Sequence, residues 1–316
     1  MEALVSLIDQ HGRKIRKLRL SLTDKCNLRC HYCMPIDSTF MDEEKYLSPE
    51  DYSSIVSELC DHGLEELRLT GGEPLLRKNF EVIIERLSRL PLRKIGLTTN
   101  GIFLDRYLEI LKANRVHHLN ISLDSLKEEN FRKITYGNHL KKVLANIELA
   151  QKMNFHIKLN VVAMRGVNDH ELLDFVEYSK STGIEVRFLE LMRIGFACGN
   201  QADQFISASE LISNLQKNFE LKAVVKEMDS TSFNYLLSNG AQIGFIASES
   251  KAFCGQCSRW RLSADGILRA CLLKDDGITI KNTNKEQRED IYRTLLGMKP
   301  FERPVEVAHH MNAIGG

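Results

Sequence analysis

Three cysteines near the start of the chain have a spacing that fits a metal cluster. Cys26, Cys30 and Cys33 form a C-x3-C-x2-C pattern, so three thiolates can converge on one soft metal centre. Iron–sulfur cubanes normally take four cysteine ligands. A loop with three cysteines therefore predicts a cluster with one open iron, which can bind a small molecule, much as catalytic zinc sites keep one open position.

A structural zinc site is the alternative for this loop, because soft thiolates also accept zinc. Such a site needs a fourth ligand, and His31 is the candidate within the loop. His31 lies between two of the cysteines, where the geometry is awkward for a ligand. The cluster is therefore the favoured interpretation.

A second cysteine group lies near the end of the chain. Cys254, Cys257 and Cys271 form C-x2-C-x13-C, and zinc with an unidentified fourth ligand is again the alternative. Arg259 and Arg261 stand between these cysteines. Residues two apart on a strand share one face, so the two arginines can grip a phosphate or carboxylate beside the metal. A solvated face is the alternative for them.

The overall charge limits the kinds of partner. The formal net charge is +1, which argues against bulk attraction to nucleic acid or membranes. An anionic substrate must then be met by local basic residues. No apolar run approaches the roughly 18 residues of a membrane span, and the start of the chain lacks the features of a signal peptide. Eight cysteines then indicate metal binding or catalysis in a cytoplasmic protein.

Six strand-like runs alternate with helix-like segments, which predicts a parallel barrel or open sheet. Six units are too few for a complete eight-stranded barrel, so we expect a partial (β/α)6 barrel of TIM type with its site at the C-terminal ends of the strands. The predicted strands are Lys17–Ser21, Leu64–Leu69, Lys94–Thr98, His118–Leu123, Ile157–Val162 and Glu185–Leu189.

Capping signals place several helices between and after these strands. Ser48 and Pro49 start a helix that stops at Gly63, and Asn168 is expected to cap a helix through Lys180. A further helix is expected over Ser207–Phe219. We divide the chain into a partial barrel, residues 1–205, and a smaller C-terminal α+β region, residues 206–316, that carries the second cysteine group.

The first cysteine loop has a companion motif. Thr70-Gly71-Gly72-Glu73-Pro74 follows the second strand, and its glycines let the backbone approach a ligand closely, with an ordinary strand-end turn as the alternative. The two motifs together resemble the radical S-adenosylmethionine (SAM) superfamily. The resemblance implies that Cys26, Cys30 and Cys33 hold a 4Fe–4S cluster. SAM would chelate its open iron, and one electron would cleave SAM to a 5′-deoxyadenosyl radical.

The same resemblance implies a set of residues around SAM. Asp124 would line the pocket, with a carboxylate at a helix N-terminus as the alternative. The residues expected to bind SAM are Tyr32, Gly71, Gly72, Glu73, Asn100 and Ser122.

The second cysteine group sharpens the resemblance. Cys254-x2-Cys-Ser-Arg-Trp-Arg-Leu-Ser-Ala-Asp-Gly, the Asn120-Ile-Ser-Leu-Asp motif and the terminal Gly315-Gly316 are similar to the MoaA family, the GTP 3′,8-cyclases of molybdenum cofactor biosynthesis. The match covers nearly the whole chain, with its motifs in order. It implies a second 4Fe–4S cluster on Cys254, Cys257 and Cys271, whose open iron binds the guanine of GTP.

In that family the radical removes hydrogen from ribose C3′, and C3′ then attacks guanine C8 to give 3′,8-cyclo-7,8-dihydro-GTP. Implied partners are an electron donor, a cyclic pyranopterin monophosphate synthase and a second copy of the chain. Gly315 and Gly316 would enter the barrel and take part in catalysis, with a frayed terminus as the alternative. The residues expected to bind substrate are Arg19, Arg68, Thr98, Lys158, Arg187, Arg259 and Arg261.

One position departs from the family pattern. The family usually has a lysine two residues before Arg68, and this chain has Glu66, which would repel a triphosphate unless it is turned away or paired. The departure keeps open a second hypothesis, another radical SAM enzyme such as a paralogue or a peptide-modifying maturase. A zinc protein without enzymatic activity is the third. Basic side chains at six positions favour a nucleotide over a peptide.

Overall fold

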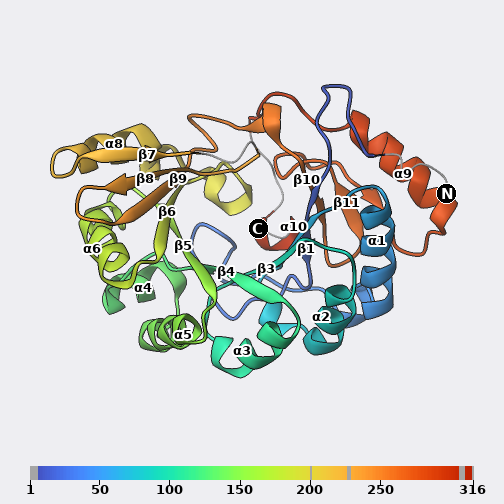
Figure 1. The fold of residues 1–316 in the computed structure, drawn as a ribbon, viewed down its shortest axis with the longest axis horizontal. Coiled ribbons are helices and arrows are strands. Elements are labelled where there is room, and N and C mark those ends of the chain that lie inside the picture. The colour runs from blue at the N-terminus through green and yellow to red at the C-terminus, as the bar shows by residue number, and fades with distance from the viewer. Residues whose placement is uncertain (1–5, 200, 226–228, 306–309, 315–316) are drawn as a thin grey trace.

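The computed structural model describes residues 6–199, 201–225, 229–305 and 310–314. They form one curved sheet with helices packed along its outer side (Figure 1). In the described residues, no helix is long and apolar enough to cross a membrane. The strands are β1 (Lys17–Ser21), β2 (Glu66–Thr70), β3 (Lys94–Thr99), β4 (Val116–Ser122), β5 (His156–Ala163), β6 (Glu185–Glu190), β7 (Leu221–Val224), β8 (Phe233–Leu237), β9 (Gln242–Ile246), β10 (Arg259–Leu262), β11 (Ile267–Arg269) and β12 (Ile278–Thr279).

Helices follow each of the first six strands, as the βα pattern predicts. The helices are α1 (Pro49–Asp61), α2 (Phe80–Ser88), α3 (Leu104–Ala113), α4 (Glu128–Thr135), α5 (Leu140–Lys152), α6 (Leu172–Thr182), α7 (Gln201–Gln204), α8 (Ala208–Gln216), α9 (Lys285–Gly297) and α10 (Met311–Ile314).

The six predicted strands are confirmed, and the sheet extends beyond them at both edges. Strand β10 pairs in parallel with β1, and β9 pairs in parallel with β6, so eight parallel strands stand in a row. The strand order runs from β12 to β7, so over the described residues the sheet does not close into a barrel. The prediction of a partial barrel is confirmed, and the sheet continues across residue 205, where the division into two domains stays a prediction.

Side-chain alternation along the parallel strands separates the core from the interior of the barrel. On β1, Leu18 and Leu20 are almost completely buried among the helices, whereas Lys17 and Arg19 line a cavity inside the curved sheet. Outside β10, Trp260 is fully buried and packs near Tyr292 of α9. Strand and helix packing therefore leave one polar, inward-facing surface.

The helix boundaries agree in part with the sequence signals. Ser48 forms a capping box at the start of α1, and Ser207 caps α8. Asn168 stands at the predicted helix start, as the N-cap of a short 3-10 helix over Asp169–Glu171 that leads directly into α6, but its side chain makes no capping hydrogen bond. The side-chain amide of Asn168 instead donates to the carbonyl oxygens of Asp124 and Val162, so it joins the loop after β4 to strand β5.

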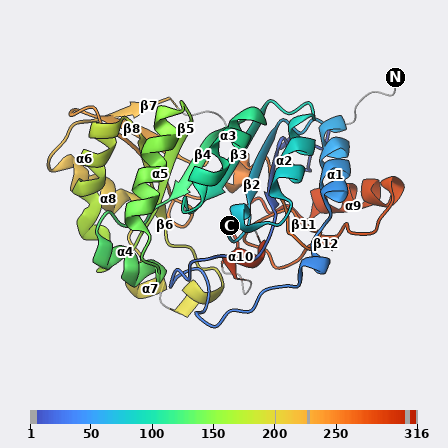
Figure 2. The same cartoon turned by 90° about the horizontal axis from the view of Figure 1, so that it is seen from below.

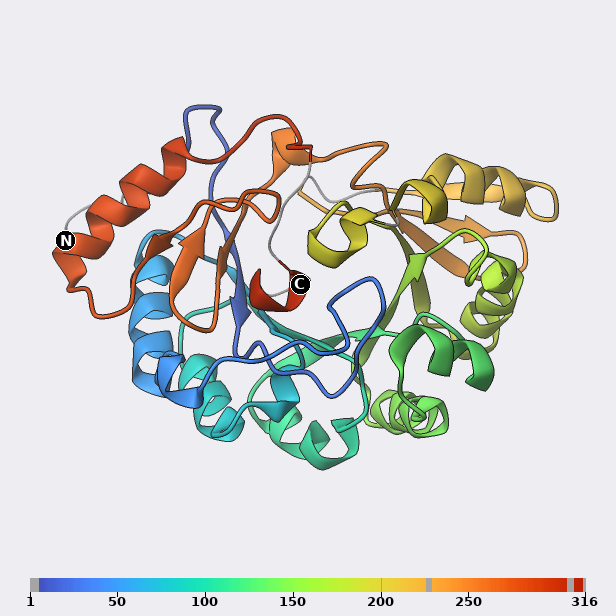
Figure 3. The ribbon, with the colours of Figure 1, turned by 180° about the vertical axis from the view of Figure 1, so that it is seen from behind.

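The end of the described chain lies inside the arc of strands. Figures 1 and 3 show α10 within the arc, and Figure 2 shows it at the same end of the molecule as the loop after β1. Ile314 is buried against Ile194 and Leu273, next to Cys271. Gly315 and Gly316 lie outside the described residues, so their predicted role stays a prediction.

Candidate active site

The first cysteine loop leaves the C-terminal end of β1 and rests on α4. The amides of Arg29 and His31 donate to the carbonyl oxygens of Thr135 and Ile134, each at 3.0 Å. The Cys33 amide donates to the Cys30 carbonyl oxygen at 2.8 Å. These backbone hydrogen bonds fix the path of the loop.

Gly71 and Gly72 bring the loop after β2 against this segment. A Cβ atom on Gly71, whose φ is +153°, would lie 2.5 Å from the carbonyl oxygen of Thr23, and one on Gly72 would lie 2.6 Å from that of Asp24. The amide of Gly72 donates to Thr23 at 2.7 Å. The glycines thus permit a close approach of two backbones, which positions the cysteine loop beside β2.

Glu73 ties the ends of β2 and β3 together. Its side chain is 1% exposed and accepts hydrogen bonds from Thr99 Oγ1 and the Asn100 amide, both at 2.7 Å. Burial raises the pKa of Glu73 to about 7 in spite of these hydrogen bonds. Asn100 in turn donates to Asn27 at 2.9 Å, which links β3 to the cysteine loop.

Tyr32 and Asp124 connect the cysteine loop to the far side of the barrel. The Tyr32 hydroxyl donates to Asp124 Oδ2 at 2.7 Å, and the Val162 amide of β5 donates to Asp124 Oδ1 at 2.8 Å. Burial raises the pKa of Asp124 to about 6. Helix α4 begins only at Glu128, so Asp124 does not act as a carboxylate at a helix N-terminus.

Buried polar atoms without partners mark the interior near these strand ends. Thr98 Oγ1 of β3 and Asn160 Oδ1 of β5 are buried and have no hydrogen-bond partner within the described residues. Ser122 of β4 is the register partner of Asn160. Unpaired buried polar atoms are costly, so this part of the interior fits a polar ligand such as SAM.

The thiols of the first group lie in a surrounding that disfavours their charge. Burial and the nearby Glu73 raise the pKa of Cys26 to about 11. Burial, Asp124 and Cys33 raise the pKa of Cys30 well above its ordinary value. A positively charged metal centre removes this penalty by binding the thiolates.

The second cysteine group is held by buried cations. Lys299 is 3% exposed and donates to Cys257 Sγ at 3.5 Å and to the carbonyl oxygens of Arg259 and Ala270 at 2.7 and 3.0 Å. Arg13 pairs with Asp9 and donates to the carbonyl oxygen of Cys254 at 2.6 Å. Lys299 and Arg13 thus join segments that are distant in sequence.

Nearby cations favour the charged thiolate form of one of these cysteines. Burial opposes ionisation of Cys257, yet Arg259 and Lys299 lower its pKa to about 6. Burial and the neighbouring Cys271 raise the pKa of Cys254. The mutual effects show that the thiols of each group are neighbours.

The spacing of the thiols bears on the kind of metal. Among the residues that the structure describes, no group of three or more His, Cys, Asp or Glu side chains could hold a single metal ion. In a cubane each thiolate binds a different iron, so the ligands lie farther apart than those of one ion. Each donor set offers three thiols, and thiolates are the ligand type that 4Fe–4S clusters take.

Inside the curved sheet lies a cavity of about 380 Å³ with a strongly basic lining, within the usual size range of ligand pockets. Seven cations and three carboxylates line it. The cations are Lys17, Arg19, Arg68, Lys94, Lys158, Arg187 and Arg259, and the carboxylates are Glu66, Glu185 and Asp229.

Strand register brings three arginines side by side, of which Arg261 is buried and Arg19 and Arg68 are half-buried. Arg19 of β1 is the register partner of Arg68 on β2 and of Arg261 on β10. Burial and the nearby Arg259 lower the pKa of Arg19 to about 10, and burial and Arg19 lower that of Arg68 to about 9. Burial and Arg19 also lower the pKa of Arg261. A bound polyanion would relieve this repulsion.

Gly96 makes room for one of these arginines. A Cβ atom on Gly96 would lie 2.6 Å from the Arg68 guanidinium carbon. Through this space Arg68 reaches β3 and β4, where it donates to the carbonyl oxygens of Leu97 and His118 at 3.3 and 3.2 Å. Arg68 is therefore held in place before any ligand arrives.

The structure brings most of the predicted substrate residues into one place. Arg19, Arg68, Lys158, Arg187 and Arg259 line the cavity. Arg261 is buried next to Arg19 in the sheet register. The alternative of a solvated arginine face is therefore wrong.

Several residues of the site were missed at the level of sequence. Lys17 and Lys94 line the same cavity, and alternation from Arg19 could have identified Lys17. Lys299 could not have been identified, because nothing in its neighbourhood shows that it folds back to Cys257.

Comparison with known proteins agrees with this geometry. Residues 20–179 match the family model described as "Radical SAM superfamily", and residues 184–302 match "Molybdenum Cofactor Synthesis C". Among solved structures, Streptococcus suis SuiB bound to S-adenosylmethionine has a TM-score of 0.66 at 11% identity, covering 91% of this chain and 69% of that chain; this likeness concerns the fold. The fold and the cysteine loop together define a radical SAM protein.

Relatives with higher sequence identity identify the family within this class of protein. A protein of Synechocystis sp. named GTP 3′,8-cyclase is 56% identical over 311 residues, covering 98% of this chain and 95% of the relative. One of Aquifex aeolicus with the same name is 37% identical over 314 residues, covering 95% of this chain and 98% of the relative. The chain belongs to the GTP 3′,8-cyclase family.

Proposed function

We propose that this protein converts GTP to 3′,8-cyclo-7,8-dihydro-GTP, the first step of molybdenum cofactor biosynthesis. The names of its relatives support this. The observation that carries the proposal is the layer of three arginines, Arg19, Arg68 and Arg261, which lie side by side on neighbouring strands and repel one another. This layer suits the triphosphate of GTP.

The reaction uses two 4Fe–4S clusters and SAM. When bound, the first cluster and SAM would supply a 5′-deoxyadenosyl radical, which takes the hydrogen from ribose C3′. Cys26, Cys30 and Cys33 would hold the first cluster. Cys254, Cys257 and Cys271 would hold the second.

The loops at the strand ends would bind SAM. The carboxylate of Glu73 and the amide of Asn100 are fixed by hydrogen bonds to neighbouring strands, so they are positioned before SAM arrives. The hydroxyl of Tyr32 is bound to Asp124, which leaves its ring to pack near the adenine. Gly71, Gly72 and Ser122 complete this set.

The barrel would hold the substrate. Arg19, Arg68 and Arg261 would bind phosphate oxygens with Lys158, Arg187 and Arg259, while Thr98 would offer its unpartnered hydroxyl to SAM or ribose. Keeping C3′ close to C8 is chiefly a positioning task. Loss of one hydrogen atom from GTP is balanced by one electron and one proton, so the product is an isomer of GTP.

The remaining partners belong to the same proposal. A reductant must supply the electrons, and a cyclic pyranopterin monophosphate synthase would consume the product. We also propose a homodimer, which the family resemblance implies. A cytoplasmic location is proposed because all eight cysteines are free thiols, as in a reducing compartment. Gly315 and Gly316 would take part in the radical step, which the burial of Ile314 near Cys271 supports.

An anaerobic incubation tests the proposal. Cluster-reconstituted protein is mixed with SAM, dithionite and GTP, with ATP as the control nucleotide. We expect a new isomer of GTP, detected by chromatography and mass spectrometry, that requires SAM and is not formed from ATP. Formation of 5′-deoxyadenosine with no change in GTP would reject the cyclase and favour another radical SAM activity, such as peptide modification.

A further inference from the structure

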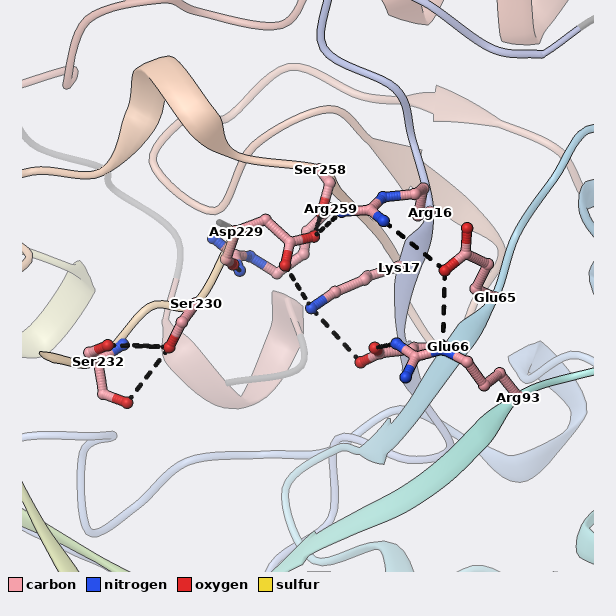
Figure 4. A network of polar contacts seen from close by, with 10 residues as sticks. All are labelled: Arg16, Lys17, Glu65, Glu66, Arg93, Asp229, Ser230, Ser232, Ser258 and Arg259. Carbon is pink, nitrogen blue, oxygen red and sulfur yellow. Dashed lines mark hydrogen bonds and ion pairs between the residues drawn. The ribbon is translucent and has the colours of Figure 1, made fainter. Parts of the chain in front are cut away.

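A network of ion pairs occupies the part of the cavity farthest from the first cysteine loop (Figure 4). It lies at the N-terminal ends of β1, β2 and β10, where Lys17 is the register partner of both Glu66 and Arg259. The cysteine loop lies at the opposite ends of these strands. The network is thus one layer of side chains beyond Arg19 and Arg68, or about 7 Å along the strands.

Glu66 is neutralised within this network. Its carboxylate forms an ion pair with Arg93 and lies 3.5 Å from Lys17 Nζ. Arg93 reaches Glu66 from outside the cavity lining. Because two cations share this carboxylate, Glu66 does not present an uncompensated negative charge to a triphosphate.

Lys17 is the cation of this network with the best access to a new ligand. Its Nζ lies 2.8 Å from Asp229 Oδ1 and lines the cavity. An ammonium group has three N–H donors, and the two carboxylates account for two of them.

The carboxylate partners of Lys17 do not depend on it. Asp229 also accepts from Arg16 at 3.0 Å and from Ser258 at 2.5 Å, and Glu66 keeps Arg93. Lys17 can therefore turn toward a phosphate without leaving a buried carboxylate unpaired, which would be costly.

A second donor beside Lys17 points to the same ligand. Arg259 Nη2 is buried and has no hydrogen-bond partner among the described residues, while its Nη1 donates to the carbonyl oxygen of Asp229 at 3.1 Å. Arg259 lines the cavity and pairs with Lys17 in the sheet register. A buried guanidinium N–H next to an exchangeable ammonium group suits a phosphate oxygen.

We propose that Lys17 binds the terminal phosphate of GTP, with Arg259 beside it, and so supplies from β1 the cation that Glu66 does not supply from β2. This rests on the proposed function. Neighbouring strands are about 4.8 Å apart, so a cation at either position of the pair can reach the same phosphate. Lys17 is then a residue that selects a triphosphate over shorter nucleotides.

Nucleotide binding to the reconstituted holoenzyme tests the proposal, by anaerobic calorimetry with GTP and GMP. We expect Lys17→Gln to weaken GTP binding about tenfold or more, the loss of one charged hydrogen bond, and to leave GMP binding nearly unchanged. Lys17→Arg should keep the preference for GTP. Lys222→Gln, at an exposed lysine on β7, is the control and should change neither.

Exchanging the charges of Lys17 and Glu66 gives a more specific test than the single substitution. Lys17→Glu with Glu66→Lys restores a cation beside Arg259, so it should bind GTP within about threefold of the wild type, whereas Lys17→Glu alone should not. An unchanged ratio of GTP to GMP affinity in Lys17→Gln, or an equal loss for both nucleotides, would overturn the role of Lys17. Failure of the wild type to bind GTP would instead reject the proposed function.

Discussion

The two cysteine groups contain equal numbers of thiols in opposite electrostatic surroundings. The first lies near the buried carboxyl groups of Glu73 and Asp124, and the second lies near the cations Arg259 and Lys299. The first is placed by loops at the C-terminal ends of parallel strands, and the second by long-range contacts of Arg13 and Lys299. The number of ligands therefore does not determine what each cluster does.

The difference fits a division of labour. A cluster that binds the positively charged SAM is well served by nearby carboxyl groups, whereas one that binds the base of a polyanionic nucleotide is well served by nearby cations. The basic cavity reaches the second group through Arg259, which lines the cavity and lowers the pKa of Cys257. The same three-thiol donor set can thus serve two chemistries because its neighbours differ.

Removing one ligand from each group should give the largest effects. Cys30→Ala should reduce 5′-deoxyadenosine formation to background, because SAM loses its cluster. Cys257→Ala should keep SAM cleavage and lose the nucleotide product. Both products are quantified by liquid chromatography and mass spectrometry. Cyclised nucleotide from Cys257→Ala would contradict the division of labour.

Adding one methyl group should have different effects on the two cysteine loops. Gly72→Ala would place a Cβ against the backbone of Asp24 and Lys25, at a cost of about 3 kcal/mol or more, and should lower iron binding by the first group. Gly255→Ala is the matched change in the second loop, where a Cβ meets only the Phe301 ring at 3.5 Å. It should be tolerated. Iron content is measured in each variant, with the other cluster deleted by Cys→Ala; equal losses would contradict the account.

Thiol reactivity should differ between the groups in cluster-free protein. With a pKa of about 6, Cys257 is mostly thiolate at pH 7, whereas Cys26, with a pKa of about 11, is not. Iodoacetamide should label Cys257 at least about tenfold faster. Raising the pH from about 7 to 9 should speed labelling of Cys26 and leave Cys257 nearly unchanged. Peptide mapping gives both rates, and the reverse order would contradict the assigned surroundings.

Lys299 should tune the second cluster alone, with the smallest effect. Lys299→Met removes an N–H donor to Cys257 Sγ, and hydrogen bonds to cluster sulfurs raise the reduction potential. We expect the potential of the second cluster to fall on the order of tens of millivolts, with Lys299→Arg intermediate. Redox titration followed by EPR measures this, and Lys222→Met, at an exposed lysine on β7, is the surface control. A shift in the first cluster would show a general structural effect.

The sequence predicts those parts of the site that are local in the chain. The loop Cys26–Cys33, the motif Gly71–Glu73 and the six parallel strands follow from spacing and periodicity. Strands β9 and β10 were missed as parallel members of the sheet, because each joins an edge without the usual βα repeat.

The parts of the site that the sequence does not predict depend on contacts between residues that are distant in the chain. Lys17 and Asp229, which form a hydrogen bond, are 212 positions apart in the sequence. Lys299 and Arg259, which form another, are 40 positions apart. Asn168 does stand at the predicted helix start, but its side-chain amide donates to the loop after β4 and its side chain does not cap the helix. Short sequence patterns do not predict such contacts.

The most direct test of the central claim uses GTP deuterated at C3′. Reconstituted protein is incubated anaerobically with SAM, dithionite and the labelled GTP, and 5′-deoxyadenosine is analysed by mass spectrometry. The account predicts deuterium in 5′-deoxyadenosine from the wild type and none from Cys257→Ala, which would still cleave SAM. Unlabelled 5′-deoxyadenosine from the wild type would contradict the claim that the second cysteine group and the basic cavity hold GTP for hydrogen abstraction at C3′.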